Sequence, residues 1–163
     1  MTQLNYPSPT FPGEPAVSID VPDGWERVSA VATRLAARAT GEASFHTNVV
    51  VLLDRRASGT DPGVAVQELA VEAAQRPNGD VSEPFEAIFD GRTWVGCDLS
   101  WDDATVGRVL QVHLFTLVPG PQDSPVAFLV QVTGSCLASR ENADFPVLKE
   151  AMSSVRLVAS PGR

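Results

Sequence analysis

Residues 81–135, VSEPFEAIFDGRTWVGCDLSWDDATVGRVLQVHLFTLVPGPQDSPVAFLVQVTGS, decide the fold. Apolar and polar residues alternate along four stretches of this segment, as in β-strands that turn one face to a core. We expect strands at 83–89, 92–101, 107–118 and 126–135. The dipeptide Asp90-Gly91 suits a two-residue type I′ hairpin turn, and the other links are short. The segment therefore predicts an antiparallel meander of four strands.

Three further strands are predicted before the meander. Val17, Ile19 and Val21 alternate with polar residues, which indicates a first strand that ends at Pro22-Asp23-Gly24. Residues 28–39 contain a second strand with a weaker pattern. The apolar, largely β-branched run at 47–53 predicts a third, central strand.

Two helices flank this set of strands in the sequence. After Asp61-Pro62-Gly63, apolar residues recur at helical spacing, so we expect a helix over 61–76, which Pro77-Asn78-Gly79 ends. A second helix is expected at about 145–155, where Leu148 and Met152 mark one face and Pro146 helps to start the helix. The fold class is therefore α+β, with an antiparallel sheet of six or seven strands and two main helices. Residues 1–15 are expected to form a flexible arm, 16–158 a single domain and 159–163 a tail.

Composition limits the partners of the protein. Its 20 Asp and Glu residues against 12 Lys and Arg residues give a formal net charge of -8, which disfavours nucleic acid and anionic membrane surfaces. No stretch approaches the roughly 18 apolar residues of a membrane-spanning helix, so no membrane insertion is expected. Residues 1–9 resemble no secretory signal, which predicts a cytoplasmic protein. Another protein or a hydrophobic ligand remains as the expected partner.

The two cysteines, Cys97 and Cys136, are expected to be free core residues. Their predicted strands lie two apart, which separates them by about 9.6 Å at ~4.8 Å per strand. A disulfide needs Cα atoms within about 7 Å. The two thiols should therefore not be bonded to each other.

Catalytic motifs are missing from the sequence. It contains no zinc-protease, hydrolase, phosphate-loop or dinucleotide-binding signature, so we expect no enzyme, no cofactor and no metal. The adjacent carboxylates Asp102 and Asp103 are typical of a solvated turn. Ser135 and Cys136 end a strand and have no base at a motif spacing.

Alternation along the meander predicts one mixed face that carries the candidate binding residues. The two-residue turn at Asp90-Gly91 places aromatic residues of the first two strands on one face, and the same face continues if the next hairpins keep the apolar sets together. The candidate residues on it are Phe85, Trp94, Asp98, Gln111, His113, Phe115 and Gln131. The opposite face, expected to be continuous core, would carry Ile88, Val95, Cys97, Leu99, Leu110, Val112, Leu114, Phe128, Val130 and Val132.

This mixed face has two interpretations. Polar groups among aromatic residues either line a ligand cavity or hydrogen-bond to one another on a sheet face half covered by a helix. His113 beside the carboxylate of Asp98 would be the one plausible acid/base pair.

The order of the elements resembles the PsbP-like fold, and within it the actinobacterial LpqN/LpqT lipoprotein family. The likeness rests on residues 17–25 (VSIDVPDGW), residues 48–51 (NVVV), the Phe89-Asp90-Gly91 hairpin and the closing Leu148 and residues 152–156 (MSSVR). It implies an α/β/α sandwich and a non-enzymatic role in binding proteins or lipids, with no catalytic residues to carry over. Those lipoproteins start with a signal peptide and a lipid-acceptor cysteine, which residues 1–15 do not show.

Three functions remain open at this point. A protein-binding adaptor or chaperone-like module predicts an exposed apolar groove. A carrier of a small hydrophobic ligand predicts an enclosed pocket lined by Phe85, Trp94, His113 and Phe115. An enzyme predicts a reactive cluster at His113 and Asp98. We favour the adaptor because of the resemblance and because no long insertion would obviously close a pocket, and we rank the enzyme last.

Overall fold

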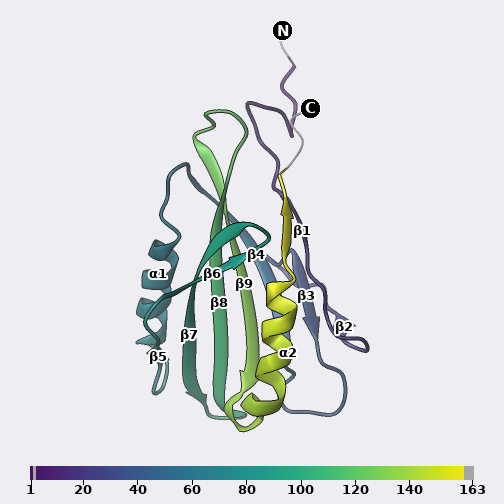
Figure 1. Cartoon of the computed structure of the whole chain (residues 1–163), viewed down its shortest axis with the longest axis vertical. Coiled ribbons are helices and arrows are strands. Elements are labelled where there is room, and N and C mark those ends of the chain that lie inside the picture. Colours follow the sequence, from purple (N-terminus) through teal and green to yellow (C-terminus); the bar gives the residue numbers. More distant parts are fainter. Residues whose placement is uncertain (2, 160–163) are drawn as a thin grey trace.

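The computed structural model describes residues 1 and 3–159 (Figure 1). Residues 160–163 of the predicted tail lie outside this part. Within the described residues the chain forms ten strands, two α-helices and one 3-10 turn, at Ala138–Arg140. The strands are β1 Ala16–Ser18, β2 Glu26–Arg27, β3 Leu35–Arg38, β4 Asn48–Ala57, β5 Asp80–Val81, β6 Phe85–Phe89, β7 Arg92–Asp103, β8 Gly107–Pro119, β9 Val126–Leu137 and β10 Arg156–Val158, and the helices are α1 Gly63–Ala73 and α2 Glu141–Ser153.

Eight of the strands form one antiparallel sheet, which confirms the predicted α+β fold class. Its order is β2-β3-β4-β9-β8-β7-β5, and β6 also pairs with β7. The short strands β5 and β6 pair with different parts of the long strand β7, so the eight strands occupy seven positions. The four strands of the predicted meander are β6, β7, β8 and β9, and the central strand is β4.

The first predicted strand is shorter than expected and lies elsewhere. β1 covers Ala16–Ser18 and pairs with β10 in a separate two-stranded sheet, so it ties the start of the domain to the end of α2. Ile19 and Val21 follow β1 without joining a sheet, although both pack against the core. Their alternation therefore reflects burial on one side of an extended segment.

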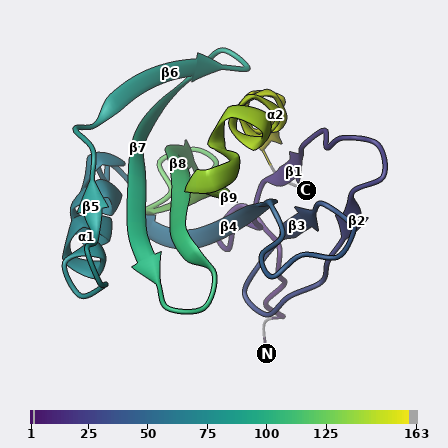
Figure 2. The ribbon, with the colours of Figure 1, turned by 90° about the horizontal axis from the view of Figure 1, so that it is seen from below.

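The sheet has a helix on each face, as Figure 2 shows. On the α1 face, Ala65, Val66 and Leu69 of α1 pack on Cys97, Leu99, Phe115 and Leu129 of the sheet. On the α2 face, Met152 of α2 and the following Val155 pack with Trp94, Leu114, Val130 and Val132. The layers are therefore α/β/α, with one core on each side of the sheet.

Local chemistry explains where the helices start. The Asp61 carboxylate accepts a hydrogen bond from the N–H of Gly63, the first residue of α1, at 2.9 Å. α2 begins four residues earlier than the predicted 145 and carries Pro146 inside it. Its start is anchored to the residue just before β4, because Thr47 donates a 2.5 Å hydrogen bond to Asp144, which also pairs with Arg140.

Candidate functional site

The predicted binding residues fall on both faces of the sheet, so the single mixed face is wrong. In the register of β7 and β8, Cys97 is opposite His113 and Asp98 is opposite Val112. Asp98 therefore lies on the α2 face and His113 on the α1 face. Phe85 and Trp94 share the α2 face with Asp98, whereas Gln111, Phe115 and Gln131 share the α1 face with His113.

The residues that we expected on the opposite, continuous core face are also divided between the two faces of the sheet. Four of them, Ile88, Val95, Cys97 and Leu99, lie on the α1 side, and the other six lie on the α2 side: Leu110, Val112, Leu114, Phe128, Val130 and Val132.

The turn between β7 and β8 causes this difference. Asp103 pairs with Gly107, which leaves a loop of residues 104–106. The Asp103 carboxylate accepts hydrogen bonds from the N–H groups of Thr105 and Val106, and Gly107 has a φ of 90°. A three-residue hairpin loop is a common connection, and it places residues of equal parity opposite each other. The apolar pattern did not reveal this register, since a helix buries each face.

On the α1 face, the polar side chains form one hydrogen-bonded cluster around His113. Gln111 Nε2 donates to Ser135 Oγ at 2.9 Å, so its Oε1 faces His113 Nε2 at 3.0 Å. On the other side of the ring, His113 Nδ1 lies 3.1 Å from both Thr133 Oγ1 and Gln131 Nε2. An acceptor on one side and donors on the other fit a neutral imidazole that carries its proton on Nε2.

Burial keeps His113 in this neutral form. The residue is 4% exposed and its ring is stacked with that of Phe115, with the centroids 6.2 Å apart. Burial, with a smaller contribution from the positive charge of Arg76, lowers the pKa of His113 to about 4. Because Asp98 lies on the other face, the predicted His113–Asp98 acid/base pair does not form.

On the α2 face, Phe85, Trp94 and Asp98 lie in three different environments. Trp94 is a core residue, and Phe85 covers Gly96 so closely that a Cβ there would lie 2.5 Å from its ring. Asp98 lines a hollow of about 160 Å³ with Glu141, and burial together with the Glu141 charge raises the pKa of Asp98. These three residues do not enclose a common pocket.

The two cysteines are buried on opposite faces and both are free. Burial, with a smaller effect of Asp98, raises the pKa of Cys97 to about 11. Burial, with smaller effects of nearby carboxylates, raises the pKa of Cys136 to about 11. Neither thiol is therefore activated as a nucleophile.

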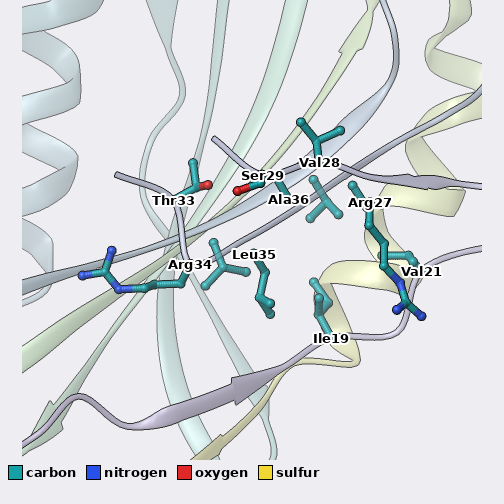
Figure 3. A pocket seen from close by; sticks show the side chains of 12 residues that line it. Ile19, Val21, Arg27, Val28, Ser29, Thr33, Arg34, Leu35 and Ala36 are labelled. Atoms are coloured by element: carbon teal, nitrogen blue, oxygen red, sulfur yellow. The ribbon is translucent and has the colours of Figure 1, made fainter. Parts of the chain in front are cut away.

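An apolar pocket lies elsewhere, against β3 and β4 on the α2 face. It has a volume of about 260 Å³. Its walls come from three places: the extended segment after β1, the chain between β2 and β3, and the sheet itself (Figure 3). The lining residues are Ile19, Val21, Arg27, Val28, Ser29, Thr33, Arg34, Leu35, Ala36, Ala37, Val49 and Val51.

This pocket, which we call the β3 pocket, contains none of the predicted site residues. Six of its twelve lining residues are Ile, Val or Leu, and two of these, Val49 and Val51, lie in the buried part of β4. Mostly apolar walls with a few polar groups at the mouth are typical of ligand sites. The alternation of Ile19 and Val21 was visible in the sequence, but residues 22–34 carry no periodic pattern that would have placed them over β3.

A second hollow, which we call the α1 groove, runs between α1 and β4. It measures about 350 Å³ and has Phe115, Leu129 and Gln131 among its lining residues. Two of these, Phe115 and Gln131, belong to the predicted site. Carboxylates of Asp54 and Glu68 also line the groove, and both pair there with Arg56.

Two further features of the described residues bear on the site. Among residues 1 and 3–159, no group of three or more His, Cys, Asp or Glu side chains is arranged to hold a metal ion. In the same residues, no helix has the length and apolarity to cross a membrane.

Comparisons with known proteins show the fold. No protein-family model matches the sequence, and no curated protein matches it. Among solved structures, the chain is similar to LpqN of Mycobacterium tuberculosis, described as involved in cell envelope biogenesis, with a TM-score of 0.72, 15% identity and coverage of 90% of this chain and 86% of that one. It is also similar to cyanobacterial PsbP from Synechocystis sp. PCC 6803, with a TM-score of 0.57, 12% identity and coverage of 96% and 98%. The chain therefore has the PsbP-like fold, related in structure to LpqN.

Proposed function

We propose that this protein is a non-catalytic binding protein, and that the β3 pocket receives the apolar part of a small ligand. The observation that carries the proposal is the pocket itself, because Ile19, Val21, Leu35, Val49 and Val51 line one open hollow of about 260 Å³. Apolar surface that a ligand removes from water contributes about 25 cal/mol per Å². An apolar group bound there would gain this contribution.

The pocket changes the order of the functions considered from sequence. The sequence alone favours the adaptor over the carrier because it contains no long insertion that would close a pocket. Residues 19–34, in which the two-residue β2 is the one regular element, supply walls of the β3 pocket instead. The pocket originally expected from Phe85, Trp94, His113 and Phe115 is not formed, since these residues lie on two faces.

An enzyme remains the least supported function. Both ring nitrogens of His113 already have hydrogen-bond partners, and the thiols of Cys97 and Cys136 have raised pKa values. Asp98 is separated from His113 by the sheet. These observations support a binding role over an acid/base or nucleophilic one.

A neutral, environment-sensitive dye such as a phenylnaphthylamine tests the proposal. We expect it to bind the wild-type protein with increased fluorescence. Val28→Trp places a large ring at the wall of the pocket and should weaken binding by at least roughly tenfold, the equivalent of ~1.4 kcal/mol. Val31→Trp is the matched control, because Val31 is 97% exposed in the same loop and does not line the pocket.

Both variants should keep the wild-type circular dichroism spectrum. Equal dye binding by wild type and Val28→Trp would contradict the proposal, as would loss of binding in both variants. Absence of any dye binding to the wild type would contradict it as well.

A second candidate function, docking of another protein, is favoured by strand β6. This strand pairs on one side only, with β7, and its outer edge is free in the described part of the chain. Ile88 is 74% exposed and Phe85 is also exposed. Exposed strand edges with apolar side chains are typical sites for the addition of a partner strand. If a partner docks there, a pull-down with the wild type should recover it and one with Ile88→Asp should not.

A further inference from the structure

We propose that the ligand of the β3 pocket is a single-chain amphiphile with an anionic head group, and that Arg27 binds this head group. The inference rests on the proposed function, since it names the chemical class of the ligand in the same pocket. The shared chemistry is a carboxylate or phosphate at the end of one apolar chain.

The charge around the pocket is the first argument. The chain has a net charge of -8, yet the β3 pocket is lined by two arginines and no Asp or Glu. The other two hollows described above have an excess of carboxylates. Asp54, Glu68 and Glu72 line the α1 groove with a single arginine, Arg56, and Asp80, Asp98 and Glu141 line the hollow beside α2. In an acidic protein, a pocket whose charged lining residues are both arginines is distinctive and favours an anion.

The two arginines differ in how far their charge is already satisfied. Arg34 donates from Nε and Nη2 to the two carboxylate oxygens of Glu14, each at 2.5 Å. This fork lowers the pKa of Glu14 through the hydrogen bond with Arg34. Arg34 thus holds the N-terminal segment in place and has its charge balanced by a neighbour.

Arg27 has no such partner. Within residues 1 and 3–159 it forms no salt bridge and no side-chain hydrogen bond, and its neighbour Glu26 pairs with Arg38 instead, at 2.9 Å. A guanidinium presents five N–H donors in a planar fork that matches a carboxylate or phosphate group. Arg27 is therefore the cation of this pocket that remains open to a ligand.

The position of Arg27 gives the ligand a direction. In Figure 3, Arg27 and Val21 lie at one end of the pocket, Arg34 lies at the other end, and Leu35 lies between them. With the head group bound to Arg27, the apolar chain of the ligand would lie along Val21 and Leu35. The volume of about 260 Å³ is below the ~300 to 1,000 Å³ of sites for drug-sized ligands, which favours one chain over a bulkier molecule.

The inference is tested by displacing the neutral dye with amphiphiles that share one apolar chain and differ in their head group. The competitors are dodecanoate, dodecyl phosphate, dodecanol and dodecylamine, all used below their aggregation concentrations. We expect the two anions to displace the dye from the wild type at roughly three- to tenfold lower concentration than dodecanol, as suits a partly solvated charge-assisted pair. The stronger of the two anions identifies a carboxylate or a phosphate ligand.

Arg27→Gln should abolish the preference for anions and leave displacement by dodecanol unchanged. Arg38→Gln is the control, because it removes the same charge from the neighbouring strand at a residue that does not line the pocket. It should keep the preference.

Three results would overturn the inference while the dye still binds: equal displacement by dodecanol and the anions, stronger displacement by dodecylamine, or equal loss of the preference in both variants. In these cases the proposed function stands without its anionic head group. Failure of the dye to bind the wild type overturns both.

Discussion

We expect acid to destabilise the protein through His113. Burial lowers the pKa of His113 to about 4, below the value of 6.5 that applies to the unfolded chain. Between these two pH values the unfolded chain binds a proton at this residue and the folded protein does not. The contribution of His113 is therefore fully present above pH ~6.5, and the free energy of unfolding falls as the pH falls, by about 1.36 kcal/mol per pH unit.

Over the whole window, from about pH 6.5 to about pH 4, the loss amounts to roughly 3 kcal/mol. Such a loss is a substantial part of the ~5 to 15 kcal/mol by which a domain is stable. The structure explains why a proton is excluded. A charged ring would be buried, and Nδ1 faces Thr133 Oγ1 and Gln131 Nε2, an amide nitrogen that can only donate.

Urea unfolding at several pH values measures this effect. Between pH 7 and pH 5, the wild type should lose about 2 kcal/mol more than His113→Gln, which cannot titrate in this range. The readout is the difference in slope, because carboxylates contribute equally to both proteins.

Equal slopes for the wild type and His113→Gln would refute the reasoning. That result would mean that the ring is protonated as easily in the folded protein as in the unfolded chain. The hydrogen-bonded cluster on the α1 face would then not hold a neutral histidine.

Three further predictions concern packing and reactivity. Gly134→Ala should lower the free energy of unfolding, measured in urea, by about 1 to 3 kcal/mol, because the added Cβ would lie 2.7 Å from Met152 Sδ under α2. An unchanged midpoint would mean that α2 can move off the sheet freely. Cys97 and Cys136 should both resist alkylation at pH 8 in the native protein and both react in denaturant, since burial holds their pKa values at about 11; a denatured, unreduced sample with no reactive thiol would contradict the structure. Thr47→Val should lower the thermal midpoint by removing a donor to the buried carboxylate of α2, at a cost of about 1 kcal/mol or more, and a midpoint equal to the wild type would show that this contact contributes nothing.

Local chemistry made the hairpin between β6 and β7 predictable. Asp90 has a φ of 51° and Gly91 a φ of 67°, the two positive values that a type I′ turn needs. The register follows directly, and Ala87 is opposite Trp94 as expected. Residues next to such a turn can be paired from sequence because the turn itself sets their register.

The candidate site was less predictable. Gln111, His113, Phe115 and Gln131 were correctly grouped on one face, since β8 and β9 pair as expected. The prediction that Asp98 lies on the same face was wrong. It depended on the register set by the turn between β7 and β8, and on the assumption that only one face of the sheet is core. The β3 pocket was missed, since Arg27 and its neighbours carry no signal of the surface that they cover.

The sequence by itself determined the two helices, β4 and the four strands of the meander, because alternation, turn residues and helical spacing act over a few neighbouring positions. The tertiary structure alone decided which residues meet across the sheet and where the pocket lies. Those contacts depend on the turn after Asp103 and on the path of residues 19–34 over β3, which join parts of the chain far apart in sequence. Because a helix packs on each face of the sheet, apolar residues of β7 are buried in either register. Only the packed structure shows which of the two registers forms.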